Sequence, residues 1–251
     1  MKLLSPPALG SFVEYSSADN STAEPAIDFH QVVKSGNLPA GITDKQSVAK
    51  SMLDVDRWLP YAAEVYGTSR DMRDYIVVPT TIFLSEIPNS NMAAFTFDEL
   101  SSWNSQAGRI SYRTWKGKPT HEEHANQDPT QARGVIFDAS LKDVPNYVGN
   151  LYRTVLLAGW DRNRFPEVAA RVAAGRHGYS MGCWVSDYRC SVCDASMRQG
   201  ECAHIHPKRG VKMMTAGNKL VYRIARGITG FELSAVRVPA FRSAWAEPIE
   251  N

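Results

Sequence analysis

Residues 166–185, PEVAARVAAGRHGYSMGCWV, contain a helix signal followed directly by a strand signal. Pro166 begins the first part, alanine and valine fill it, and Gly175 ends it, as expected for a helix with proline in its first turn and glycine after its last. Tyr179–Val185 is short and mostly apolar, which predicts a buried strand. The chain therefore runs from helix into strand at this point.

Ser180 lies within Gly178–Gly182, which has the G-x-S-x-G spacing of a nucleophile elbow. An elbow joins a strand to a following helix, whereas here the helix comes first, so an α/β-hydrolase fold is not predicted. Small residues beside a serine are also common in turns, so the pattern alone allows a turn serine as well as a nucleophile. A nucleophilic serine needs a base, usually histidine, and the chain has six histidines.

Strand and helix signals alternate on both sides of this stretch. Strands are predicted at Tyr75–Leu84, Ile110–Trp115, Gly134–Ala139 and Phe231–Val238, and helices at 44–59 and Asn146–Ala158. Pro60 is expected to interrupt or kink the first of these helices. Short strands interleaved with helices, without clean βαβ units, predict an α+β fold with a mostly antiparallel sheet or barrel flanked by helices.

Length, composition and charge exclude several classes of protein. The 251 residues are 43% hydrophobic and carry a formal charge of +2, which does not favour nucleic acid as the main ligand. No apolar run reaches the roughly 18 residues of a membrane-spanning helix, and the first residues do not form a signal peptide, so a cytoplasmic protein is predicted. We expect residues 1–70 to form a lead-in and a helix, and 71–251 to form the main domain.

All four cysteines fall within one short segment. They are Cys183, Cys190, Cys193 and Cys202, and His204 and His206 follow the last of them. In a reducing compartment this clustering favours a metal over disulfides. The C-x2-C pair with the third cysteine and one histidine predicts a closed, structural zinc site in an insert at 186–210. The spacing leaves either histidine possible as the fourth ligand. Cys183 is an alternative ligand, although we interpret it as a small core residue.

Two histidines stand three residues apart in His121-Glu122-Glu123-His124. The zincin pattern H-E-x-x-H instead separates its ligands by four, and prolines on both sides argue against a long helix. We expect His121 to be solvated in a polar loop, and His124, which precedes an Asn/Asp-rich turn and a strand, to be the functional histidine. A zinc-dependent hydrolase that uses both histidines is a weaker interpretation, which metal removal would test.

Three segments together resemble the prohead proteases of tailed bacteriophages, whose fold is related to herpesvirus assemblin. Residues 117–139, GKPTHEEHANQDPTQARGVIFDA, are similar to the family's catalytic-histidine strand. Ser180-Met181-Gly182 is similar to its S-[IM]-G nucleophile strand, and residues 231–240, FELSAVRVPA, to its E-[IVL]-S-x-V-x-x-P-A strand. The segments occur in the family's order, and the resemblance covers most of residues 70–245.

The resemblance implies a phage prohead maturation protease, a serine endopeptidase that cleaves scaffold or core and capsid proteins during head assembly. It places the nucleophile on Ser180, the general base on His124 and an orienting acid on Glu232. If Glu232 is not the orienting acid, the third residue of the catalytic triad would be Asp128 or Asp138, or the site would be a Ser–His dyad. One branch of the family carries a CSxC…CxH insert after the nucleophile, which favours His204 as the fourth ligand of a structural Zn²⁺.

The implied partners are phage capsid and scaffold or core proteins, with a homo-oligomer also possible, and the implied location is the host cytoplasm, within the assembling prohead or virion. The alternative is a catalytically inactive virion structural or assembly protein, built on the same fold with a structural zinc. The two differ in their fate, because a maturation protease is usually cleaved and lost from finished heads, whereas a structural protein persists at fixed copy number.

Overall fold

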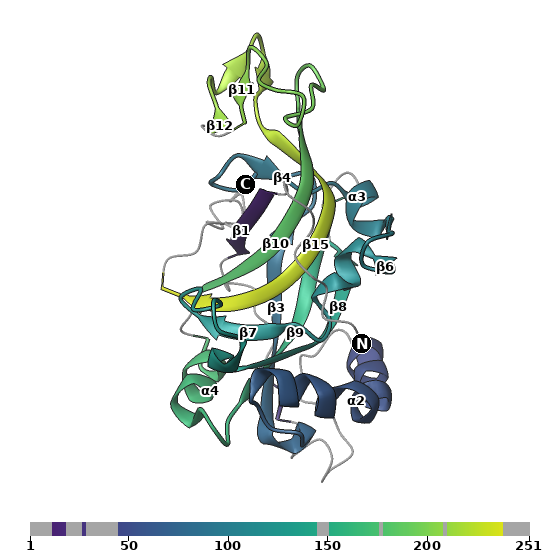
Figure 1. The fold of residues 1–251 in the computed structure, drawn as a ribbon, viewed down its shortest axis with the longest axis vertical. Helices are drawn as coiled ribbons and strands as arrows, with labels where there is room; N and C mark the ends of the chain where they lie inside the picture. Colours follow the sequence, from purple (N-terminus) through teal and green to yellow (C-terminus); the bar gives the residue numbers. More distant parts are fainter. Residues whose placement is uncertain are drawn as a thin grey trace, which may run out of the picture.

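Nine strands form one curled sheet in the computed structural model, which describes residues 12–18, 27–28, 45–144, 151–175, 178–207 and 210–237 (Figure 1). Across the sheet the strands are β1 (Phe12–Ala18), β10 (Gly178–Cys190), β15 (Arg223–Val236), β7 (Pro119–Glu122), β8 (Gly134–Asp143), β9 (Tyr152–Asp161), β3 (Tyr75–Leu84) and β2 (Ile27–Asp28), with β4 (Ala93–Ala94) beside β15. Only β7 and β4 pair in parallel with β15; the other neighbours are antiparallel. β3, the last strand but one in this order, also lies against β1, the first strand. The sheet therefore curls toward a barrel. The predicted α+β class with a mostly antiparallel sheet is confirmed.

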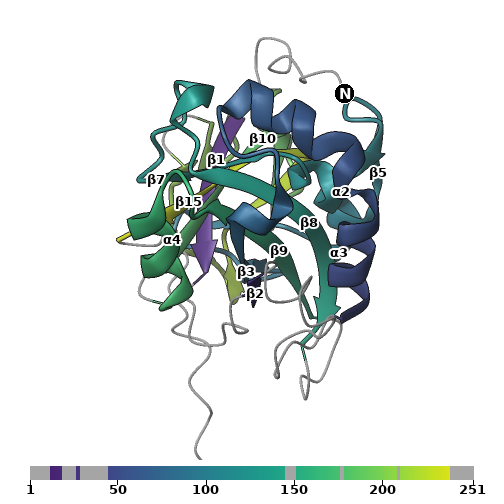
Figure 2. The same ribbon diagram turned by 90° about the horizontal axis from the view of Figure 1, so that it is seen from below.

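Helices and smaller hairpins surround this sheet (Figure 2). The helices are α2 (Lys45–Tyr66), α3 (Phe97–Ser101) and α4 (Pro166–Ala173), with 3₁₀ helices η1 (Met72–Asp74), η2 (Ser111–Trp115) and η3 (Pro129–Gln131). The hairpins pair β5 (Trp103–Asn104) with β6 (Arg109–Ile110), β11 (Ile205–His206) with β12 (Gly210–Val211), and β13 (Thr215–Ala216) with β14 (Lys219–Leu220). Among the described residues, no helix has the length and apolar character needed to cross a membrane.

Helix α2 covers the part of the sheet that contains β8, and it continues through Pro60. Val55, Leu59, Ala62 and Tyr66 recur at helical spacing and pack in one core cluster with Phe137 of β8. The helix is therefore not interrupted at Pro60, contrary to one form of the expectation. Proline leaves the carbonyl one turn earlier without its usual donor. Both Pro60 and Asp56, four residues before it, are exposed, so water can hydrate that carbonyl.

For two segments the predicted type of secondary structure is wrong. Residues 111–115 form the 3₁₀ helix η2 and not a strand; Ser111 and Thr114, three apart, are both buried, and the Thr114 hydroxyl donates to the Ser111 carbonyl at 2.7 Å. The helix predicted at Asn146–Ala158 is strand β9 from Tyr152, and residues 145–150 lie outside the described residues. Every residue of β9 from Thr154 to its end is buried. A strand buried on both faces loses the alternation that marks strands in sequence.

The antiparallel pair of β10 and β15 positions the candidate site. On one face of the pair, Tyr179 and Met181 of β10 lie opposite Ala235 and Leu233 of β15, and all four belong to the main apolar core. Alternate residues of a strand point to opposite faces. The intervening pairs, Ser180 with Ser234 and Gly182 with Glu232, therefore share the other face. The register shifts between Gly182 and Cys183, where the pair is irregular.

Candidate active site and metal-ligand cluster

Ser180, Ser234 and His121 stand side by side on three neighbouring strands. Ser180 of β10 pairs with Ser234 of β15, which in turn pairs with His121 of β7. Because directly paired residues point to the same face of a sheet, the three side chains share one face. Ser180 is 2% exposed. The candidate nucleophile thus lies in the regular part of the sheet and not in a free turn.

Glu232 is fully buried and hydrogen-bonded through both carboxylate oxygens. Its Oε1 lies 2.7 Å from Nδ1 of His124, and its Oε2 accepts a hydrogen bond from the Ser234 hydroxyl at 2.8 Å. An ordinary surface acid on a half-buried strand would be exposed, so the burial of Glu232 excludes that interpretation.

His124 lies just beyond β7 in a turn with left-handed backbone at two successive residues. The φ angles are 47° at Glu123 and 58° at His124, values that non-glycine residues seldom adopt. Two hydrogen bonds to β15 hold this turn: Glu123 N donates to the Ala235 carbonyl at 2.9 Å, and His124 N donates to the Ser234 hydroxyl at 3.2 Å. The His124 side chain remains 30% exposed. The turn therefore presents the ring toward Glu232 while leaving it accessible from solvent.

Gly182 allows the Glu232 side chain to lie against β10. A Cβ placed on Gly182 would come 2.7 Å from Cγ of Glu232 and 2.6 Å from the ring of Phe231. Both distances are too short for carbon atoms in van der Waals contact. In the sequence, Gly182 stands out only as part of the S-[IM]-G motif. The register of β10 and β15 shows its physical role, because it places Gly182 opposite Glu232.

His121 is buried, which corrects the expectation of a solvated loop residue. It is 1% exposed within β7, and its Nδ1 has no hydrogen-bond partner among the described residues. Burial lowers the pKa of His121, and the charge of Arg133 also lowers it, while the nearby Glu232 acts in the opposite direction. His121 is therefore favoured in its neutral form. The polar residues around it in sequence concealed a strand of only four residues.

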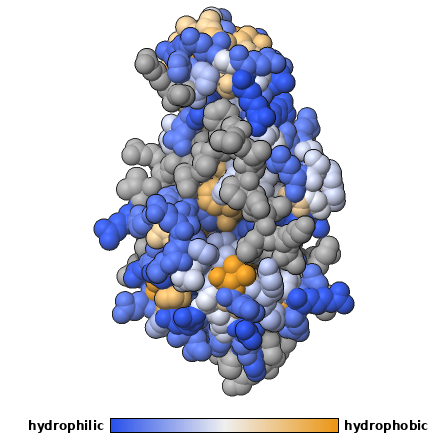
Figure 3. Space-filling view, viewed as in Figure 1, coloured by the Kyte–Doolittle hydropathy of each residue, from blue (hydrophilic) through white to orange (hydrophobic). Residues whose placement is uncertain are grey.

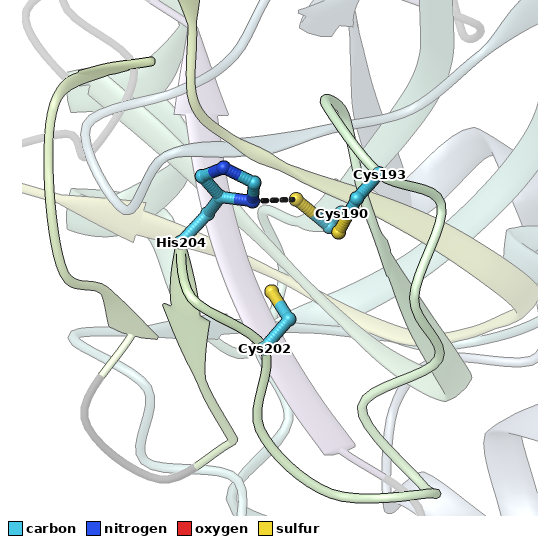
Figure 4. Close-up of side chains that lie close together, drawn as sticks. All are labelled: Cys190, Cys193, Cys202 and His204. Carbon is cyan, nitrogen blue, oxygen red and sulfur yellow. Dashed lines mark hydrogen bonds between the residues drawn. The ribbon is translucent and has the colours of Figure 1, made fainter.

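Four potential metal ligands converge at the far end of the β10–β15 pair (Figure 4). The ligand atoms of Cys190, Cys193, Cys202 and His204 all lie within 4.8 Å of one another. A tetrahedral zinc, with Zn–S of about 2.3 Å and Zn–N of about 2.0–2.1 Å, separates a sulfur from a nitrogen ligand by roughly 3.5–3.6 Å. Cys190 Sγ and His204 Nδ1 are 3.6 Å apart. The group can hold a metal, and its donor set and spacing fit zinc.

Backbone donors support this cluster. Val192 N donates to Cys190 Sγ at 3.5 Å, and Ile205 N donates to Cys202 Sγ at 3.3 Å. Burial opposes ionisation of Cys202, but the amides of His204 and Ile205 and the neighbouring thiols outweigh it, so the pKa of Cys202 is lowered. Metals bind the thiolate form of cysteine. His206 and Cys183 lie outside the group, and Cys183 is a buried core residue.

Between β10 and β15, the described residues 191–207 and 210–222 form a small lobe that projects from the sheet (Figure 1). The lobe carries three of the four ligands, and the fourth, Cys190, ends β10. Among the described residues of the lobe, the buried apolar side chains are Met197, Ile205 and Val221. Apolar side chains also show on the surface of the lobe (Figure 3). Three large apolar residues of this segment, Met213, Met214 and Leu220, are exposed. The lobe thus has a very small apolar core for its size.

No protein-family model and no curated protein matches this chain. Among solved structures, it is similar to the bacteriophage T4 capsid assembly protease, gp21, with 19% sequence identity and a TM-score of 0.38. The match covers 66% of this chain and 84% of that chain. Because both identity and TM-score are low, the function proposed below is derived from the geometry of the site and the sequence motifs.

Proposed function

We propose that the protein is a serine endopeptidase of the prohead-maturation type, with Ser180 as nucleophile, His124 as base and Glu232 as orienting acid. The observation that carries this proposal is the 2.7 Å contact between Nδ1 of His124 and Oε1 of the buried Glu232, beside the strand that bears Ser180. These residues come from three separate segments, each of which carries one of the motifs shared with prohead proteases.

The contact supports a role for one of the two ring nitrogens of His124. With Nδ1 donating to Glu232, Nε2 of His124 is the nitrogen available to take the Ser180 proton. The Ser180 oxygen then bonds to the scissile carbonyl carbon, and His124 returns the proton to the leaving amine. Water hydrolyses the acyl-enzyme by the same route. The buried carboxylate stabilises the imidazolium formed in each half of the reaction.

The proposed substrates are phage scaffold or core and capsid proteins, and the proposed place of action is the assembling prohead in the host cytoplasm. The prohead-protease motifs, and not the geometry, support this choice of substrate. We also propose that Cys190, Cys193, Cys202 and His204 bind one Zn²⁺. Four protein ligands leave no open position, so the metal would stabilise the lobe and take no part in catalysis.

A fluorophosphonate probe tests the chemistry without knowledge of the natural substrate, because it reacts with activated serines. We expect wild-type protein to gain one adduct, located on Ser180 by peptide mass analysis. Ser180→Ala and His124→Ala should lose it, while Ser186→Ala, a control on the same strand, should keep it. Folded wild-type protein without an adduct, or with equal labelling in His124→Ala, would disprove the proposal and favour the inactive structural protein.

Co-expression with phage capsid and scaffold genes tests the substrate class. New protein termini should appear with wild-type protein and be absent with Ser180→Ala. If the probe labels Ser180 but no capsid or scaffold protein is cleaved, the serine chemistry stands and the proposed substrates are wrong.

A further inference from the structure

Ser234 joins the base and the acid of the candidate site through a single hydroxyl. The group accepts a hydrogen bond from the His124 backbone N at 3.2 Å and donates one to Glu232 Oε2 at 2.8 Å. Glu232 Oε1 in turn contacts Nδ1 of His124 at 2.7 Å. The three residues thus form a closed ring of hydrogen bonds.

The hydroxyl has no alternative partner from solvent, because Ser234 is fully buried between Ser180 on β10 and His121 on β7. A hydroxyl has one hydrogen to donate. Here that hydrogen goes to the carboxylate, while an oxygen lone pair receives the backbone amide. Both interactions depend on the same oxygen atom, so they are lost together when it is removed.

The backbone turn that Ser234 contacts has an unfavourable conformational energy. Glu123 and His124 adopt left-handed conformations in succession, and such conformations persist only when the surrounding structure enforces them. A second hydrogen bond from β15 to the backbone of this turn is accepted by the carbonyl of Ala235, which no substitution removes. Ser234 adds a side-chain hydrogen bond to the same backbone, while Glu232 contacts the His124 ring.

We infer that Ser234 is a positioning residue, which fixes the His124 ring and the Glu232 carboxylate in the geometry that catalysis needs without itself touching substrate. This inference rests on the proposed function. Removing the hydroxyl frees the turn to relax and leaves Oε2 of Glu232 buried without its donor. A misplacement of about 1 Å in a catalytic group can cost roughly 10²-fold in rate.

The test compares Ser234→Ala with Ser234→Thr and with a matched control, Thr114→Val. The Thr114 hydroxyl is also buried and also bonds twice, donating to the Ser111 carbonyl and accepting from Gly230 N on β15, both at 2.7 Å. Its loss also removes one donated and one accepted hydrogen bond, but away from the site, and its donated bond goes to a neutral carbonyl where that of Ser234 goes to a carboxylate. If Ser234→Ala does not fold, Ser234→Cys replaces it, since a thiol keeps the size but bonds weakly.

The first readout is fluorophosphonate labelling of Ser180, resolved into the saturating rate and the probe concentration at half-saturation. We expect Ser234→Ala to lower the saturating rate about 10²-fold with little change in half-saturation. Ser234→Thr should recover most of that rate, and Thr114→Val should label as wild type. The second readout is the low-field proton signal of the His124 Nδ1–H, which should weaken or shift in Ser234→Ala and persist in Thr114→Val.

The outcomes separate this inference from the proposed function. Wild-type labelling and an intact low-field signal in Ser234→Ala would overturn the role of Ser234 alone. An equal loss in Ser234→Ala and Thr114→Val would also overturn it, because it would show a general effect of stability. Absence of Ser180 labelling in the wild type would instead overturn the proposed function.

Discussion

At one end of the β10–β15 pair, Ser180, Ser234 and Glu232 lie in regular register between neighbouring strands. At the other end, beyond Cys190 and Arg223, the chain leaves the sheet and forms four strands of only two residues each. The first end has a backbone fixed by strand pairing on both sides of β15 and a buried acid bonded through both oxygens. The second end has few buried apolar residues and a convergent set of thiol and imidazole ligands.

The difference shows two ways to hold side chains within a few ångströms of one another. In the sheet, geometry comes from register, so it survives as long as the strands stay paired. An isolated two-stranded hairpin is at best marginally stable in water, and these hairpins have strands of only two residues. The lobe therefore needs another source of folding free energy. Metal binding can supply it, because the free energy of binding to a site absent from the unfolded chain is also free energy of folding. The predictions below test this contrast.

The largest effect is expected for Glu232→Gln. The variant keeps size and hydrogen-bonding capacity but removes the charge that would stabilise the His124 imidazolium. In the serine-protease template, loss of the orienting acid costs up to about 10⁴-fold in rate. Processing of a capsid substrate, or labelling of Ser180, measures the loss. Glu122→Gln is a matched control, since Glu122 pairs with Arg133 outside the proposed triad.

Wild-type rates in Glu232→Gln would remove this residue from the mechanism. A Ser–His dyad would remain, or a third member such as Asp138 or Asp128. Of these, Asp128 already accepts hydrogen bonds from Thr130 at the start of η3.

A smaller effect is expected for Gly182→Ala. The added methyl group would overlap Cγ of Glu232 and the Phe231 ring, so both must move. We expect a loss of roughly 10²-fold in the Ser180 labelling rate, as for other small misplacements. Gly200→Ala in the lobe is the comparison, since nothing lies within 4 Å of the added carbon there, although its left-handed φ adds local strain. Equal rates in wild type and Gly182→Ala would show that the Glu232 position tolerates displacement.

Metal removal should affect the lobe and spare the sheet. We expect one zinc per chain by elemental analysis, and its loss in Cys193→Ser but not in Cys183→Ala, which changes a cysteine outside the cluster. Hydrogen exchange after chelation should show lost protection in residues 191–222 and retained protection at 178–182. Protein without zinc, or with protection unchanged by chelation, would contradict the assignment. Loss of protection at both ends would show that the lobe and the sheet fold as one unit.

The smallest effect is expected for His121→Asn. The sequence predicts that His121 is dispensable for processing while His124 is essential, so labelling of Ser180 should change little. Burial lowers the pKa of His121 below its ordinary value of 6.5, which favours the neutral form in the folded state. The unfolded chain therefore binds more protons as pH falls through about 6.5, and stability declines there. Denaturant unfolding at pH 7 and pH 5 should show a smaller decline in His121→Asn; an equal decline, or loss of labelling, would contradict it.

The sequence predicted the fold class and the strands whose signals are local. Tyr75–Leu84 matches β3 exactly, and Pro166 and Gly175 bound α4 as expected. The sequence-based prediction was wrong for β9, because a strand buried on both faces has no alternation of apolar and polar residues. It also missed β7, whose four residues are too few to show a strand period. The contribution of Ser234 also escaped it. That role depends on how β15 lies against the turn after β7. The hydrogen bond between them joins His124 and Ser234, which are 110 positions apart in the sequence.

The parallel pairing of β15 with β7 also has a consequence for synthesis. Glu232 follows His124 by 108 residues, and the turn that presents His124 is anchored on the same late strand. At about 5–20 residues per second, the ribosome needs roughly 5–20 s to make the intervening chain. During that interval His124 is already made, but the acid proposed to orient it and the strand that holds its turn do not yet exist. If the proposed mechanism holds, the order of the strands thus keeps a growing polypeptide unable to cleave its neighbours until β15 has been made and has docked.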